Sequence, residues 1–347
     1  MTMTMTMNDL KATLETLPST HTAPKPNIGA IETSRGSAEI KYVFVCGMPR
    51  SGTTIVAKEI ASLANCTGFE NTGVIMDEGQ YLQDVYPTEW ACGGAGRFGF
   101  AAEAHLTEES PLLTPSNVAR LHKSWEDHWD RDKTIRVEKT PGNLLKTRFL
   151  QAAFPNARFI VVKRHPIPAS LATQKWSLTP LHELFAHWLH CHKLFDEDKK
   201  HLNHLFELSY EDYIEDPRKC LEKIANFLRT EFSGSLQEEV TDGYDRKYFD
   251  RWARMLKSSP FKAYYRRVVE ECERKFREHG YSLAPAHPRA TASFDEHKPV
   301  RGILPRLLYM GSNIFFALWR AGRELRIWVE RAALIRAWIP SLKGAPR

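Results

Sequence analysis

Short apolar runs alternate with longer segments of helical periodicity through the middle of the chain. The runs are rich in Val, Ile and Phe, which is typical of buried strands. The pattern predicts strands at 42–45, 135–137, 158–163 and 205–208, and helices at 53–63, 144–153, 180–196 and 217–229. Strands that alternate with helices pair in parallel, so we expect an α/β protein with a central parallel sheet flanked by helices. Such a sheet binds ligands beyond the carboxyl ends of its strands.

Composition divides the chain into four segments. Residues 1–38 are rich in Thr, Ser and Pro with few large apolar side chains, and we expect them to be disordered. Residues 39–283 carry the strand and helix pattern and form the predicted folded domain, with a loop-rich stretch at 65–114. Residues 284–300 have the Pro- and Ala-rich composition of a linker, and 301–347 form a basic amphipathic helical tail.

The net charge of +6 lies in this tail. Residues 301–347 contain nine Lys or Arg and two Glu, which leaves the other residues close to neutral. A surface that follows a phosphate backbone needs positive charge on the folded domain, so nucleic-acid binding is not expected. The six cysteines form no CxxC pair, and the first ten residues lack the basic and apolar regions of a signal peptide. We therefore expect a cytoplasmic protein.

An apolar stripe runs through the tail. Residues 318–339 repeat apolar side chains at helical spacing with Arg between them, and the uncharged run 307–319 is shorter than the ~20 residues that span a bilayer. Such a helix is typical of peripheral contact with an anionic membrane, here through 303–340 at the inner membrane face. The same pattern is equally typical of a helix that packs on the folded domain or on a second subunit. Membrane contact and oligomeric state therefore stay open.

The stretch VFVCGMPRSGTTIVAKEI, residues 43–60, is typical of a phosphate-binding loop between a strand and a helix. Gly47 and Gly52 permit the turn, and the N–H groups at the start of the next helix attract anions. Where the GxxxxGK[ST] motif carries a lysine for the β- and γ-phosphates, this chain has Thr53. Arg50 instead places a positive charge just before the turn.

The GMPRSGTT turn resembles the 5′-phosphosulfate loop of sulfotransferases that use 3′-phosphoadenosine 5′-phosphosulfate (PAPS). The resemblance implies a P-loop-like three-layer fold, with PAPS as co-substrate and 3′-phosphoadenosine 5′-phosphate as product. It also implies that no metal is required, because the donor carries a single phosphate at its 5′ end. The residues implied in holding this phosphate are Arg50, Ser51, Gly52, Thr53 and Thr54.

A second segment, ARFIVVKRHPIPASLATQKW at 157–176, resembles the 3′-phosphate site of the same family. Arg164 stands at the implied position for a guanidinium fork on this phosphate. The usual serine is absent, so either Ser170 or Thr173 is left to supply a hydroxyl. Lys247 is a further candidate contact to the nucleotide.

In-line sulfuryl transfer needs a cation near the leaving oxygen and a base near the acceptor hydroxyl. VEKTP resembles the setting of a functional lysine in related sulfotransferases, which implies Lys139, together with Arg50, at the leaving oxygen. For the base, the resemblance leaves two glutamates open. Glu70 lies about twenty residues beyond the loop, and Glu78 opens a predicted helix.

The sequence thus predicts transfer of a sulfuryl group from PAPS to a hydroxyl of a small-molecule, glycan or lipid-linked acceptor. One alternative is a P-loop nucleotide or small-molecule kinase, which needs a loop lysine and Mg²⁺. The other is a nucleotide-binding, membrane-associated protein without catalytic activity. A metal site is not expected, although His187, His190 and Cys191 have the spacing of zinc ligands, because their helix uses its apolar face for burial.

Overall fold

The structure is a computed structural model, and it describes residues 39–177, 179–237 and 245–284. The predicted N-terminal segment (1–38) and the basic tail (301–347) lie outside the described residues, as does the linker beyond Ala284. The predictions of disorder, of a linker and of a membrane-binding helix therefore remain predictions.

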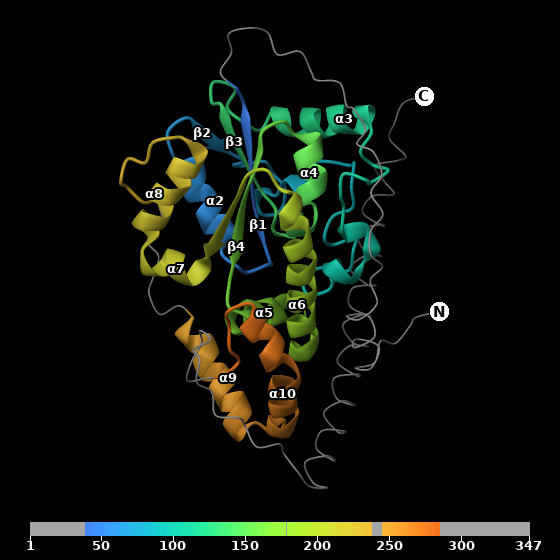
Figure 1. Cartoon of the computed structure of the whole chain (residues 1–347), viewed down its shortest axis with the longest axis vertical. Helices are drawn as coiled ribbons and strands as arrows, with labels where there is room; N and C mark the ends of the chain where they lie inside the picture. Colours follow the sequence, from blue (N-terminus) through green and yellow to red (C-terminus); the bar gives the residue numbers. More distant parts are fainter. Residues whose placement is uncertain (1–38, 178, 238–244, 285–347) are drawn as a thin grey trace. The chain divides into compact units, whose positions relative to one another are not determined.

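A five-stranded sheet forms the centre of the described residues, and its strands run parallel in the order β2-β3-β1-β4-β5 (Figure 1). The strands are β1 (Lys41–Gly47), β2 (Cys66–Gly68), β3 (Ile135–Lys139), β4 (Ala157–Lys163) and β5 (Leu205–Ser209). Val45 pairs with both Lys139 and Ile160, so the segments that follow β1, β3 and β4 start at one edge of the sheet. The predicted α/β fold with a central parallel sheet is confirmed.

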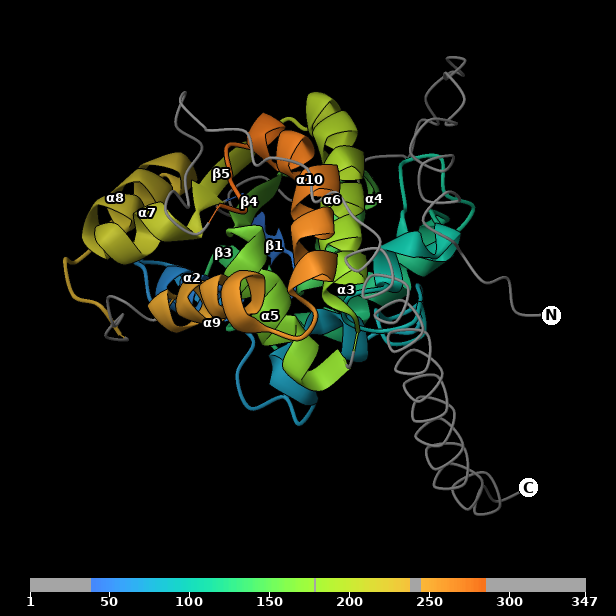
Figure 2. The ribbon, with the colours of Figure 1, turned by 90° about the horizontal axis from the view of Figure 1, so that it is seen from below.

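Helices cover both faces of this sheet (Figure 1). They are α2 (Thr53–Ala61), α3 (Pro115–Glu126), α4 (Thr147–Ala153), α5 (Pro166–Ser177), α6 (Leu181–Asp198), α7 (Tyr210–Glu215), α8 (Pro217–Leu228), α9 (Arg246–Ser258) and α10 (Lys262–Glu278). Figure 2 shows α9 and α10 beside α5 and α6, against which they pack. Single 3₁₀ turns lie at Ile75–Asp77, Gly79–Tyr81, Phe98–Phe100, Ala102–Ala104, Pro141–Leu145 and Lys199–His201.

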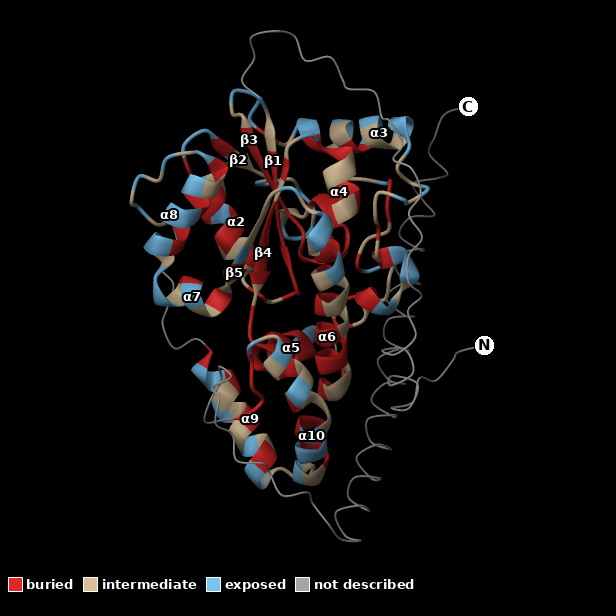
Figure 3. Cartoon of the chain, in the orientation of Figure 1, coloured by how far each residue is buried: buried red, intermediate tan, exposed pale blue. Residues whose placement is uncertain are grey.

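The alternation of side chains along the central strands builds two separate cores. In β1, Phe44 and Cys46 join the core under α4 and α6, whereas Val43 and Val45 join the core under α2 and α8. Successive side chains of a strand point to opposite faces, and both faces of a parallel sheet are buried by the helices that connect its strands. Figure 3 shows the result as continuous burial along the central strands.

Two local predictions differ from the structure. The loop-rich stretch contains β2, whose three residues are too few to show a period in the sequence. The helix expected to begin at Glu78 is absent: Met76 and Asp77 adopt positive φ angles, and Glu78 is extended between two 3₁₀ turns. Among the described helices, none is both long enough and apolar enough to cross a membrane.

Candidate active site

β1 passes into α2 through a tight turn that carries the predicted phosphate loop. Gly52 has φ 91°, a left-handed conformation that favours glycine, and a Cβ at this position would overlap the Tyr210 ring. No side chain caps the N-terminus of α2, and the first N–H groups of a helix have no acceptor within it. The turn therefore presents N–H donors and the positive end of the helix dipole at the carboxyl edge of the sheet.

Two side-chain donors of this turn are buried without a hydrogen-bond partner among the described residues. They are Ser51 Oγ and Arg50 Nε. The guanidinium carbon of Arg50 lies 5.0 Å from the centre of the Trp176 ring, which fixes its direction. Because buried polar groups are nearly always paired, these two donors fit an anionic ligand such as a phosphate.

Arg164 follows β4 directly and reaches the same turn. Its Nη1 donates to the carbonyl oxygen of Arg50, and its guanidinium carbon lies 4.4 Å from the centre of the Tyr210 ring. It also forms a buried two-point ion pair with Asp245, with Nη2 donating to Oδ1 and Nε to Oδ2. A carboxylate therefore already contacts the guanidinium fork that the sequence predicted for a phosphate.

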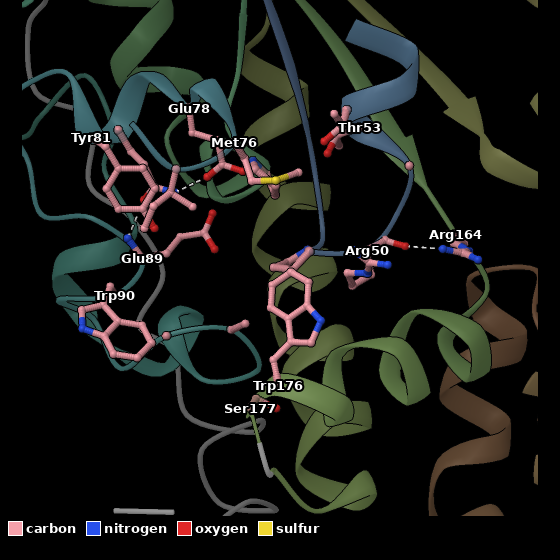
Figure 4. A pocket seen from close by; sticks show the side chains of 18 of the residues that line it. Arg50, Thr53, Met76, Glu78, Tyr81, Glu89, Trp90, Arg164, Trp176 and Ser177 are labelled. Carbon is pink, nitrogen blue, oxygen red and sulfur yellow. Dashed lines mark hydrogen bonds between the residues drawn. The ribbon is translucent and has the colours of Figure 1, made fainter. Parts of the chain in front are cut away.

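These cationic and hydroxyl groups form one wall of a cavity of about 670 Å³. In Figure 4, Thr53, Arg50 and Arg164 lie on one side, while Glu78 and Glu89 lie on the other. The cationic wall comes from the ends of β1 and β4, and the acidic wall comes from the loop that follows β2. The cavity thus attracts an anion on one side and offers proton acceptors on the other.

Glu89 is a buried carboxyl group that points into this cavity (Figure 4). Its Oε1 accepts a hydrogen bond of 2.6 Å from Gly142 N, and a Cβ on Gly142 would overlap the carboxylate. Burial raises the pKa of Glu89 to about 7, with a further upward contribution from the negative charge of Glu78. A carboxylate with this pKa is suited to accept a proton near neutral pH.

Glu78 lines the cavity next to Glu89, and a buried lysine holds it there. Lys139 Nζ donates to Glu78 Oε1 at 3.0 Å and to the carbonyl oxygen of Met76 at 3.0 Å. Gln80 connects the two glutamates, because its Nε2 donates to Glu78 Oε2 at 2.6 Å and its Oε1 accepts from Glu89 N at 2.7 Å. Gln80 therefore joins the Glu78 carboxylate to the backbone of Glu89.

The family model described as the sulfotransferase family matches residues 43–234, which is more than half of the chain. This chain belongs to the sulfotransferase family. An uncharacterised protein of Aquifex aeolicus (strain VF5) is 22% identical over 275 residues, a match that covers 72% of this chain and 32% of that protein. The chain thus spans about a third of the length of this curated relative.

Solved sulfotransferase structures are also similar to the chain. The sulfotransferase domain of the Synechococcus PCC 7002 olefin synthase is 16% identical, with a TM-score of 0.40 over 84% of this chain and 98% of that chain. The sulfotransferase of Alicyclobacillus acidocaldarius is 13% identical, with a TM-score of 0.39 over 70% of this chain and 97% of that chain.

Most of the donor-site residues implied by the sulfotransferase resemblance meet at the cavity. Its lining includes Arg50, Gly52, Thr53, Thr54 and Arg164, and the buried Ser51 lies in the same turn. Residues more than 100 positions apart in the chain are thus brought together by the pairing of β1 with β4.

Three other residues predicted for the sulfotransferase donor site do not reach this cavity. Ser170 and Thr173 line a separate space of about 10 Å³, and Thr173 Oγ1 donates to the carbonyl oxygen of Ala169 at 2.8 Å. Lys247 is exposed on α9 and is absent from the cavity lining. Thr173 Oγ1 also lies 3.5 Å from the carbonyl oxygen of Pro49, and the hydroxyl residues Ser177 and Thr179 of the next segment line the cavity.

The two candidate bases are separated by the structure. Glu70 is exposed and lines a second hollow of about 270 Å³, which also contains Lys139. Thr54, Lys58 and Met76 line both hollows. Glu78 therefore lines the cavity that holds Arg50 and Arg164, whereas Glu70 lines the second hollow, which Thr54 also reaches.

Sequence reasoning missed Glu89 and Asp245. Glu89 lies in the loop-rich stretch, and its carboxylate meets Gly142, 53 residues further along the chain. Asp245 meets Arg164 across 81 residues and lies beyond the part of the chain that matches the family. Neither residue belongs to a local motif, so the sequence offers no signal for them.

Proposed function

We propose that this chain transfers a sulfuryl group from PAPS to the hydroxyl group of an acceptor. The observation that carries the proposal is the division of one cavity into a cationic wall, with Arg50 and Arg164, and an acidic wall, with Glu89. The family match supports the reaction class. The donor identity rests on the loop, which carries Thr53 where a nucleoside-triphosphate enzyme carries lysine.

The donor side of the cavity suits a nucleotide with one phosphate at each of two positions. The 5′ end fits the turn, where the unpartnered Ser51 hydroxyl and Arg50 Nε would each gain an acceptor. The 3′-phosphate fits the fork of Arg164, in place of the Asp245 carboxylate. Arg164 and Asp245 would then separate when the donor binds.

Transfer requires one bond to form and one to break. The acceptor oxygen bonds to sulfur, the bond between sulfur and the 5′-phosphate oxygen breaks, and the electron pair of that bond stays on the leaving phosphate. Glu89 accepts the proton of the acceptor hydroxyl, and Arg50 stabilises the charge on the leaving oxygen. Lys139 acts through Glu78, as a positioning residue, because its ammonium group contacts Glu78 and lies outside the cavity lining.

Calorimetry of nucleotide binding tests the donor side. We expect 3′-phosphoadenosine 5′-phosphate to bind more tightly than AMP, ADP or ATP-Mg. Arg164→Ala should weaken that binding by about 10- to 100-fold and leave AMP binding nearly unchanged, because charged hydrogen bonds are worth about 1.5–3 kcal/mol. Asp245→Asn should tighten it, since the carboxylate competes for the same guanidinium.

Arg131→Ala is the matched control, because Arg131 is exposed and pairs only with Asp127 among the contacts that the structure describes. Tighter binding of ATP-Mg than of 3′-phosphoadenosine 5′-phosphate would overturn the proposal in favour of the kinase alternative. Equal affinity for AMP and 3′-phosphoadenosine 5′-phosphate would remove Arg164 from the donor site.

A further inference from the structure

Exposed apolar side chains gather at the mouth of the cavity. Within the described residues, the large apolar side chains that are more than a third exposed are Ile75 (67%), Met76 (53%), Trp90 (37%), Phe100 (37%) and Trp176 (52%). All but Phe100 line the cavity. They come from three separate segments of the chain, so no local sequence bias explains why they meet. Apolar groups that converge around a concave site typically contact a ligand or partner.

These side chains divide between the two walls. Trp176 belongs to the cationic wall, because its ring lies against the Arg50 guanidinium. Ile75 and Met76 come from the segment that carries Glu78, and Trp90 directly follows Glu89 (Figure 4). An apolar rim formed by Ile75, Met76 and Trp90 therefore surrounds the carboxylates that face the acceptor.

Beyond its carboxylates, the acidic wall offers the Gln80 amide and the Tyr81 hydroxyl group. Gln80 already uses its amide for Glu78 Oε2 and Glu89 N. Gly93, Gly94 and Ala95 also line the cavity and carry no polar side-chain atom. A sugar brings several hydroxyl groups, each of which needs a partner once it leaves water. Tyr81 adds only one hydroxyl group, so this wall is suited to an acceptor with few hydroxyl groups at the edge of an apolar body.

We infer that the acceptor is an uncharged amphipathic alcohol, in which a hydrocarbon body contacts Ile75, Met76 and Trp90 and its hydroxyl group points to Glu89. This inference rests on the proposed function and narrows its acceptor class. The negative charge of the wall disfavours acceptors that carry a carboxylate or phosphate near the hydroxyl. The apolar rim favours long or bulky hydrocarbon groups over glycans.

The test uses the full chain and a series of 1-alkanols from butanol to decanol. Calorimetry measures alkanol binding to the complex with 3′-phosphoadenosine 5′-phosphate, and a second assay follows formation of that nucleotide from PAPS. We expect affinity and kcat/KM to rise with each added methylene by up to about four-fold until the rim is covered. Glucose and inositol should bind at least about ten-fold more weakly than hexanol.

Variants of the apolar rim test whether its side chains cause the dependence of alkanol affinity on chain length. Ile75→Ser and Met76→Asn should each lower octanol affinity by about four-fold or more and leave nucleotide binding unchanged, since both side chains are exposed. Asparagine tolerates the positive φ of Met76, and the variant keeps the carbonyl group that Lys139 contacts. Phe100→Ser is the matched control, because Phe100 is exposed and apolar but lies outside the cavity.

Three results would overturn the inference while the donor proposal stands. One is a protein that binds 3′-phosphoadenosine 5′-phosphate but shows no dependence of alkanol affinity on chain length. Another is sugar binding as tight as hexanol binding. The third is an equal effect of the Phe100 and Ile75 variants. Failure to bind 3′-phosphoadenosine 5′-phosphate would instead overturn the proposed function, on which the inference depends.

Discussion

Glu89 shows how a single side chain takes its chemistry from its surroundings. Its carboxyl group is buried, accepts one hydrogen bond from Gly142 N, and lies near the negative charge of Glu78. Burial and the neighbouring charge both favour the neutral acid, which raises the pKa of Glu89 to about 7. Glu138 has the same raised pKa of about 7 from burial, but it hydrogen-bonds Gly79 N, Thr140 and Asn143 and lies outside the cavity lining.

This pair of glutamates allows a controlled test of the base. Glu89→Gln should lower kcat by about 100-fold or more, because a positioned base contributes about 10²–10⁴-fold, and it should leave nucleotide affinity unchanged. In the wild type, kcat/KM should rise with pH and level off above about 7, where Glu89 is ionised. Steady-state rates from pH 5 to 9 measure both effects.

Glu138→Gln is the control, since it changes a buried carboxyl of similar pKa outside the cavity. It should keep the pH profile and an activity within a few-fold of the wild type. The prediction would be contradicted if the rise of kcat/KM with pH were lost in Glu138→Gln and kept in Glu89→Gln. The titrating group would then be Glu138 and not Glu89.

Among the elements, the turn between β1 and α2 matters most for the donor side. Gly52 combines a left-handed φ of 91° with close packing against Tyr210, whose ring also contacts Arg164. Gly73 has a similar φ of 82°, yet a Cβ at that position would meet no atom within 4 Å. The two glycines separate the conformational cost of a side chain from its steric cost.

Alanine at each position should therefore have different effects. Gly73→Ala should lower the free energy of unfolding by about 1–2 kcal/mol, the cost of a left-handed Cβ, and leave nucleotide binding intact. Gly52→Ala should cost about 1–3 kcal/mol more through the overlap with Tyr210, and should weaken binding of 3′-phosphoadenosine 5′-phosphate. Urea unfolding and calorimetry measure the two quantities. Equal losses of stability in Gly52→Ala and Gly73→Ala would show that the Tyr210 ring moves aside with no loss of free energy.

For the described domain as a whole, buried titratable groups make stability depend on pH in two opposing ways. Burial lowers the pKa of His187 to about 3, so His187 stays neutral in the fold, and stability is lost as pH falls below its unfolded pKa of 6.5. Glu89 keeps its proton in the fold up to about pH 7, whereas the unfolded chain releases it near 4.5. Its contribution is therefore lost as pH rises from about 4.5 to about 7.

Comparison with the Glu89→Gln protein isolates the contribution of Glu89 to the pH dependence of stability. The free energy of unfolding of the wild type, relative to the variant, should fall between pH 4.5 and 7 by up to about 3 kcal/mol and stay constant above that range. Urea unfolding at pH 5, 6, 7 and 8 measures the difference. Glu70→Gln, which changes an exposed carboxyl, serves as control. A difference that rises with pH would contradict the raised pKa of Glu89.

Local properties of the sequence determined four of the five strands, the predicted phosphate loop and the two arginines. The strand order places the GMPRSGTT turn and Arg164 at one edge because both follow apolar runs that pair in parallel. Turn formation at Gly47 and Gly52, strand propensity and the positive end of a helix act over a few residues, so they can be recognised without the fold. The missing lysine is likewise a local feature.

Contacts between distant segments decided which side chains line the cavity and how deeply they are buried. Glu70 and Glu78 line different hollows, and positive φ angles at Met76 and Asp77 replace the helix expected at Glu78, which no helical pattern predicts. Ser170 and Thr173 line a separate small space beside Pro49, which only the packing of α5 decides, so their predicted role stays a prediction. Burial raises the pKa of Glu89 to about 7, and this burial, like its contact with Gly142, exists only in the tertiary structure.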